Sequence, residues 1–151
     1  MAIFESSVGK APSKKKWYVL LGVCIAALIV LGFWLLLRFH AEKATVTHFL
    51  DAVAAGKMDE AYRIWKPSDA YSFKDFTDDW SPGGYYGPVK SFEIEDTKHT
   101  KNSSGVTITV AVSPTSPFPS KNDAAARVKT KQVKLWVQFK DQSISYPPPE
   151  F

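Results

Sequence analysis

Cysteine is almost absent from this sequence, since Cys24 is the only one among 151 residues. One cysteine excludes an intrachain disulfide and any zinc site that needs several cysteines. Cys24 lies inside a long apolar run, and its expected role is that of a small side chain in a membrane helix. A lipid-modified cysteine is the alternative, but Val23 is large where a lipoprotein signal requires a small residue.

Metal-binding and phosphate-binding motifs are also missing. The three histidines are His40, His48 and His99, and no HxxxH or HExxH spacing occurs. Gly83-Gly84 lacks the companion residues of a phosphate-binding loop. We therefore expect no metal and no cofactor.

The sequence lacks a basic excess beyond its first segment. Residues 1–37 carry four lysines against Glu5, whereas residues 38–151 carry 15 basic and 14 acidic side chains. A nearly neutral domain does not produce the positive field of a general nucleic-acid binder. We expect no nucleic-acid partner.

One apolar segment dominates the N-terminal part. Trp17–Leu37 contains 21 residues without a charge, and as a helix it would span roughly 31 Å, about the thickness of the hydrocarbon core of a bilayer. The segment predicts a single-pass anchor in contact with lipid. A cleaved signal peptide is the alternative, but its apolar region is usually shorter.

Aromatic and small residues add detail to this anchor. Trp17 and Tyr18 mark one membrane interface, and Phe33 and Trp34 mark the other. Gly22 and Ala26 lie four residues apart and form a candidate helix-contact face, although two small residues are equally compatible with an ordinary anchor.

The charges that flank the anchor predict its orientation. Lys14, Lys15 and Lys16 precede it, and basic residues are enriched on the cytoplasmic side. We expect residues 1–16 to form a cytoplasmic tail at a bacterial inner membrane. The following domain, residues 38–146, would be periplasmic or extracellular and would end in a proline-rich tail, 147–151.

Hydrophobic periodicity predicts helices first and strands afterwards in this domain. An apolar stripe through Val46, Phe49, Leu50 and Val53 indicates a helix that ends near Gly56. Phe92 and Ile94 are expected to face the core from a strand, with Asp96 on the same side. The expected helices cover 41–55, 57–65 and 73–80, the strands cover 89–97, 106–112, 128–140 and 144–146, and 113–126 is expected to be a loop.

This order favours an α+β fold, in which a helical hairpin and a short helix pack on one face of a curved antiparallel sheet. In the hairpin FLDAVAAGKMDEAYRIW, the segment KDFTDDW and the strands that follow, the chain resembles the nuclear transport factor two-like (cone-shaped α+β) superfamily over about residues 44–146. That superfamily usually has a further strand between its second and third helices, and Pro67–Tyr71 is short for one. The stretch DWSPGGYYGPVKSFEIED resembles small bacterial membrane-anchored proteins. Members of the superfamily include enzymes, ligand-binding domains and assembly modules, so the resemblance implies a fold and leaves the function open.

Two groups of residues are candidates for acid–base chemistry. His48 and Asp51 lie three residues apart on the first helix of the domain, and Asp75, Asp78 and Asp79 lie close together on the third. Each group is also compatible with ordinary solvated helix charges.

A dense group of aromatic residues surrounds the turn at 81–84. These residues form either a contact surface for another protein, in which aromatic side chains are enriched, or the lining of the core. They are Tyr71, Phe73, Phe76, Trp80, Tyr85 and Tyr86.

A membrane anchor followed by a domain without an evident catalytic motif predicts a non-enzymatic role. We expect an accessory or scaffolding subunit of a larger membrane protein complex, for which a respiratory or photosynthetic complex is one candidate host. A membrane-tethered ligand-binding or enzymatic domain is one alternative, and a transient assembly factor is another.

Overall fold

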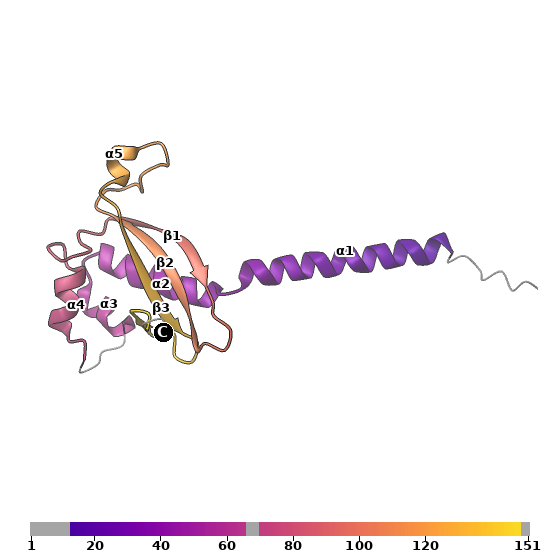
Figure 1. Ribbon diagram of the computed structural model, residues 1–151, viewed down its shortest axis with the longest axis horizontal. Helices are drawn as coiled ribbons and strands as arrows, with labels where there is room; N and C mark the ends of the chain where they lie inside the picture. The colour runs from indigo at the N-terminus through magenta and orange to yellow at the C-terminus, as the bar shows by residue number, and fades with distance from the viewer. Residues whose placement is uncertain (1–12, 66–69, 149–151) are drawn as a thin grey trace, which may run out of the picture. The chain divides into compact units, whose positions relative to one another are not determined.

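The computed structural model describes residues 13–65 and 70–148, and the chain divides into two compact units between residues 38 and 39 (Figure 1). The first unit contains α1. The second contains an α+β domain with a curved antiparallel sheet. The elements are α1 Lys14–Leu37, α2 His40–Ala54, α3 Met58–Ile64, α4 Phe73–Trp80, β1 Ser91–Lys98, β2 Gly105–Ser113, α5 Ala124–Arg127, β3 Lys131–Gln138 and β4 Ile144–Ser145.

Helix α1 begins one turn earlier than the predicted anchor. Ser13 is its N-cap, and the Ser13 hydroxyl accepts a hydrogen bond from the backbone N–H of Lys16 at 3.4 Å. None of the 24 residues in α1 is buried. By length and composition α1 is sufficient to cross a membrane.

Helices α2 and α3 form the predicted hairpin. Val46, Phe49, Leu50 and Val53 are buried along one side of α2. Gly56 ends the helix with a φ of 77°, which glycine adopts without steric cost. The N–H of Gly56 donates to the carbonyl of Val53 at 3.1 Å, and that of Lys57 donates to Ala52 at 2.9 Å. This pair of bonds is a Schellman motif, so the turn satisfies the last carbonyls of α2.

Helix α4 begins with a capping box. The Asp75 carboxylate accepts from the N–H and the hydroxyl of Ser72 at 3.0 and 2.8 Å, and the Ser72 hydroxyl accepts from the Asp75 N–H at 3.2 Å. These hydrogen bonds lower the pKa of Asp75, because they favour the charged carboxylate. The segment 67–71, where the resemblance calls for an extra strand, falls mostly outside the described residues.

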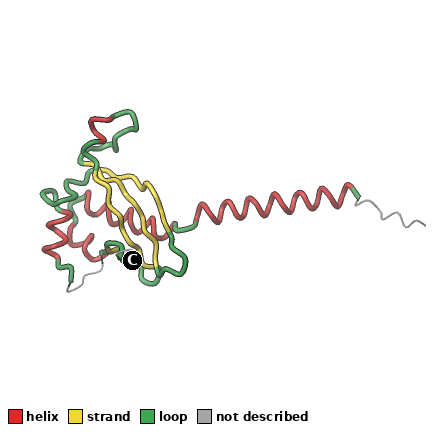
Figure 2. The backbone as a smooth tube through the Cα atoms, in the orientation of Figure 1, coloured by secondary structure: helices red, strands yellow, loops and turns green. Residues whose placement is uncertain are grey.

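The four strands lie in the order β1-β2-β3-β4, and every neighbouring pair is antiparallel. Ile94 pairs with Val110, which in turn pairs with Val133. The views in Figures 1 and 2 show α2 running behind the strands, with α3 and α4 beside it. The helices therefore cover one face of the sheet.

A bulge in β1 corrects the predicted alternation. Phe92 and Ile94 are partly buried against the core as expected, but the register shifts between Ile94 and Asp96. Asp96 then pairs with Thr109, whose neighbour Val110 points into the core. The extra residue moves Asp96 to the outer face, because successive side chains in a strand point to opposite sides.

The connection between β2 and β3 differs from its prediction. The expected loop contains the short helix α5, where the Asp123 carboxylate accepts from the Ala126 N–H at 3.0 Å. Strand β3 is shorter than the predicted 128–140 and leaves Phe139 beyond its end, where it is 37% exposed. In Figure 1 the α5 segment extends past the end of the strands.

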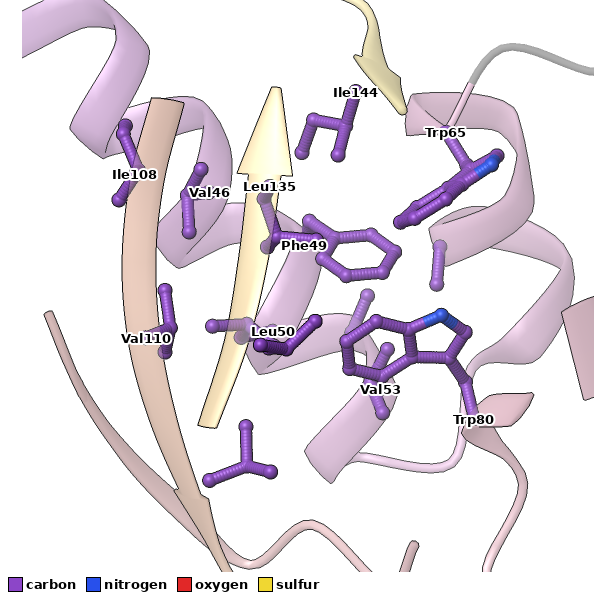
Figure 3. Close-up of a cluster of buried hydrophobic side chains, with 14 of the residues drawn as sticks. Val46, Phe49, Leu50, Val53, Trp65, Trp80, Ile108, Val110, Leu135 and Ile144 are labelled. Atoms are coloured by element: carbon purple, nitrogen blue, oxygen red, sulfur yellow. The ribbon is translucent and has the colours of Figure 1, made fainter. Parts of the chain in front are cut away.

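The core centres on the ring of Phe49. Its centroid lies 5.5 Å from that of Trp65, 6.0 Å from Phe76 and 5.1 Å from Trp80. Figure 3 shows Phe49 between Leu135 of the sheet and the rings of Trp65 and Trp80. One ring thus joins α2, α3, α4 and the strands.

Truncating this ring tests the arrangement. We expect Phe49→Ala to lower the free energy of unfolding by about 3–5 kcal/mol, because it leaves a cavity among large rings. Urea denaturation of the full chain in detergent micelles, followed by near-ultraviolet circular dichroism, measures this loss. Phe73→Ala is the matched control, because Phe73 is 41% exposed and has an edge contact with Tyr62. Its loss should be about 1 kcal/mol, and equal losses in the two variants would contradict the central role of Phe49.

Candidate functional site

A carboxylate shared by two tyrosines links the end of the chain to the helical layer. Asp79 lies in the last turn of α4, Tyr71 precedes α4, and Tyr146 follows β4. The Asp79 Oδ2 atom accepts hydrogen bonds from the hydroxyl of Tyr146 at 2.8 Å and from the hydroxyl of Tyr71. The three residues, which we call the Tyr–Asp–Tyr cluster, hold the segment after β4 against α4.

The electrostatics of this cluster favour hydrogen-bond donation over proton transfer. Burial is the largest cause that raises the pKa of Tyr71 and of Tyr146, and the neighbouring Asp79 raises both further. Burial and Asp79 also raise the pKa of the nearby Tyr86. The phenols therefore remain protonated donors at neutral pH.

A cleft of about 270 Å³ opens beside the cluster, between the end of α3 and β4. Trp65 and Tyr146 form its aromatic wall, with ring centroids 4.7 Å apart. Hydroxyl and amide groups supply polar contacts along the other walls. The lining residues are Trp65, Tyr71, Gln138, Ser143, Ile144, Ser145 and Tyr146. This combination suits a small ligand with a flat face and a few polar groups.

A polar network closes the neighbouring turn. The Gln142 amide donates to the Glu42 carboxylate at 3.2 Å, and the Thr45 hydroxyl donates to the Gln142 carbonyl oxygen at 3.1 Å. Glu42 is only 9% exposed, so this bond satisfies a carboxylate that is largely removed from water. This network was not predictable from local sequence patterns, because its partners lie about a hundred residues apart.

The histidine candidate has a different partner from the predicted one. The Nε2 atom of His48 lies 3.1 Å from the Glu60 carboxylate on α3 instead of pairing with Asp51. Lys57 shares the same Glu60 at 3.8 Å. The His48 side chain is 64% exposed, so this is a surface contact between two helices and contributes little to stability.

The three aspartates of α4 do not form a paired-carboxylate site. Asp75 caps the helix, Asp78 forms an ion pair with Lys74 at 3.2 Å, and Asp79 accepts from the two phenols. Each carboxylate thus has its own structural partner. Within the described residues, no group of three or more His, Cys, Asp or Glu side chains is arranged to hold a metal ion.

The predicted aromatic contact surface divides between core and surface. Phe76 and Trp80 are buried and line the core, which was one of the two expected roles, and Tyr71 and Tyr86 are half-buried. The exposed members are Phe73 at 41% and Tyr85 at 66%.

Tyr85 has a fixed position despite its exposure. The Lys131 ammonium lies 4.7 Å from the centre of its ring and also donates to its carbonyl oxygen. The Tyr85 N–H donates to the carbonyl of Asp78 at 3.0 Å. A Cβ atom on the nearby Gly87 would lie 1.9 Å from the Ser81 carbonyl oxygen, so only glycine allows this close turn.

The anchor candidates all lie on the exposed surface of α1. Trp17, Tyr18, Phe33 and Trp34 are each more than half exposed, and Gly22, Cys24 and Ala26 are exposed as well. Near the C-terminal end of α1 the Arg38 guanidinium lies 5.5 Å from the centre of the Trp34 ring.

No protein-family model, curated protein or solved structure matches the chain. The resemblance to the nuclear transport factor two-like superfamily therefore depends on the order of the elements alone.

Alkaline titration tests the Tyr–Asp–Tyr cluster. A phenol with a raised pKa contributes stability that is complete below about pH 10, the ordinary tyrosine value, and is lost as the pH rises. The unfolded chain releases this proton, whereas the folded protein retains it. We expect the urea midpoint of the full chain to fall steeply above about pH 10. The fall should be shallower in the double variant Tyr71→Phe/Tyr146→Phe, which has two fewer protons to release.

Phe73→Ala removes a ring but no ionisable group, so it supplies the control and should lower the midpoint without changing the steepness. The lower midpoint that the double variant has at neutral pH does not affect this comparison, because the slope against pH is the readout. Equal slopes in wild type and double variant would show that the cluster does not retain its protons on folding.

Proposed function

We propose that the protein is a non-enzymatic accessory subunit, anchored in a bacterial inner membrane by α1, whose α+β domain binds another subunit of a membrane protein complex. The observation that carries this proposal is α1 itself. Its large apolar side chains are exposed along its length, and none of its residues is buried within the chain. Lipid or the helices of other subunits are needed to remove such a surface from water.

The charges before α1 support a cytoplasmic N-terminus. Lys14, Lys15 and Lys16 form the first turn of α1, and basic residues are retained on the cytoplasmic side. The domain is then periplasmic or extracellular. Its element order and the helical cover of one sheet face support membership of the nuclear transport factor two-like superfamily.

The candidate carboxylates of α4 and the candidate His48 have structural partners, which favours a binding role for the domain over catalysis. The carboxylates of α4 serve a cap, an ion pair and the Tyr–Asp–Tyr cluster, and His48 pairs with Glu60 on the surface. Phe73 and Tyr85 provide exposed aromatic rings of the kind that form contacts between proteins. A respiratory or photosynthetic complex is one host of this type.

Native purification tests the accessory-subunit proposal. After extraction in mild detergent, the tagged protein at its native expression level should migrate with a larger complex. Phe73→Ala/Tyr85→Ala should release it, because truncating an aromatic anchor in an interface commonly weakens binding by tenfold or more. Val128→Ala truncates an exposed apolar side chain beside α5, away from Phe73 and Tyr85, and serves as the control. A monodisperse monomer would contradict the proposal, and transient co-migration would instead identify an assembly factor.

The cleft favours a second candidate function, the binding of a small molecule. A library of aromatic and sugar-like fragments would be tested by thermal denaturation of the full chain in micelles. A ligand of the cleft should raise the melting temperature, because it binds the folded state. Ser145→Trp fills the cleft from β4 and should abolish this increase. An increase that persists in Ser145→Trp would place the ligand elsewhere.

A further inference from the structure

Three rings from distant parts of the chain meet at one end of the sheet. Phe39 precedes α2, His99 lies in the turn between β1 and β2, and Phe139 lies in the turn after β3. The ring centroids of Phe39 and Phe139 are 6.1 Å apart with nearly parallel planes, and His99 lies 5.6 and 5.5 Å from them. We call this group the ring cluster.

The backbone fixes the turns that carry the ring cluster. The Phe139 N–H donates to the carbonyl of Ser104 at 2.9 Å, and Gly105 pairs with Gln138 at the first position of the β2–β3 ladder. Phe139 remains 37% exposed beside these bonds. The ring cluster is therefore a fixed, partly exposed aromatic surface.

The charge around the ring cluster is mainly positive. Lys98, Lys101 and Lys140 lie in or beside the two turns, and all three are exposed. Asp141 is the acidic residue of the same turns, and its carboxylate accepts from the N–H and the hydroxyl of Ser143 at 3.0 and 2.7 Å. Aromatic rings flanked by lysines are typical of protein surfaces that contact lipid headgroups.

The covalent chain limits how far the ring cluster can lie from the end of α1. Leu37 is the last residue of α1, and only Arg38 separates it from Phe39. Two residues reach at most about 7 Å. The headgroup region of a bilayer is roughly 5–8 Å thick on each side.

We infer that the ring cluster and its lysines, Lys101 and Lys140, form a second membrane contact, in which this end of the α+β domain rests in the headgroup region of the bilayer that α1 crosses. The inference depends on the proposed anchor and adds an orientation to it. The α5 segment joins the opposite ends of β2 and β3, so it lies at the other end of the sheet, which the same inference leaves in water.

Spin labels on single cysteines test this contact in the full chain. Thr100→Cys places a label in the β1–β2 turn, and Val128→Cys places one beside α5, where Val128 is 85% exposed. Both variants carry Cys24→Ala, and both are reconstituted at high lipid-to-protein ratio into vesicles of phosphatidylcholine with or without phosphatidylglycerol. The readout is the accessibility of the label to a water-soluble nickel complex and to oxygen.

We expect the label at residue 100 to be shielded from nickel and accessible to oxygen, more so with phosphatidylglycerol, whereas the label at residue 128 remains in water. Lys101→Glu/Lys140→Glu should expose the label at residue 100, since each lysine near an anionic surface changes binding about fivefold. Lys121→Glu/Lys129→Glu makes the same charge change beside α5 and should have no effect. Equal nickel accessibility at residues 100 and 128 would overturn the inference.

Two further outcomes separate this inference from its alternatives. A label on the native Cys24 should be inaccessible to nickel if α1 spans the bilayer, and an accessible Cys24 label would overturn the proposed anchor itself. Shielding at residue 100 that disappears when the protein is diluted in the vesicles would show contact between two copies of the chain and overturn the lipid contact.

Discussion

The domain depends on the packing of α2 across the sheet, with the Phe49 ring at the centre of that contact. The domain has no disulfide, since Cys24 lies in α1, so its stability comes from buried apolar surface and from hydrogen bonds. Phe49 contacts rings from α3 and α4, and its neighbours Val46 and Leu50 are fully buried. The short helices α3 and α4 would be unstable alone, because a helix of seven or eight residues gains little from its own hydrogen bonds. They are helical because their aromatic faces cover the same core.

Local patterns explain why most of this domain was predictable. The stripe of α2, the stop at Gly56, the cap at Ser72 and the alternation of β2 each depend on residues a few positions apart, and the structure contains all four. The bulge in β1 was not predictable from alternation, because it depends on the pairing of Asp96 with a neighbouring strand. The helix at 124–127 was missed because it has only four residues.

The candidate site was much harder to predict than the fold. Asp79 is one of three neighbouring carboxylates predicted as candidates, but its partner Tyr146 lies 67 positions away. His48 and Asp51 are separated by one helical turn, yet the histidine turns towards α3, which packs beside α2. For both Asp79 and His48, the hydrogen-bond partner comes from a segment that lies outside the helix on which the candidate was identified. The partner of Glu42 was equally unpredictable from local sequence, because Gln142 lies in the last turn of the sheet, 100 residues away.

Basic side chains lie at both ends of the sheet, Lys101 and Lys140 at one end and Lys121 and Lys129 at the other. Residues 113–131, which include α5, carry four basic side chains and one acidic one, whereas the rest of residues 38–151 carry 11 basic and 13 acidic. The Asp123 cap and the Arg127 side chain, which donates to the Ser120 carbonyl at 3.1 Å, keep the α5 segment ordered without a core of its own. At the end of the sheet that carries Phe39, the domain is joined covalently to α1 through Arg38. The Ser91 hydroxyl of β1 donates to the Thr115 carbonyl, and the Lys131 ammonium contacts Tyr85, so the α5 end is held by the rest of the domain as well as by β2 and β3.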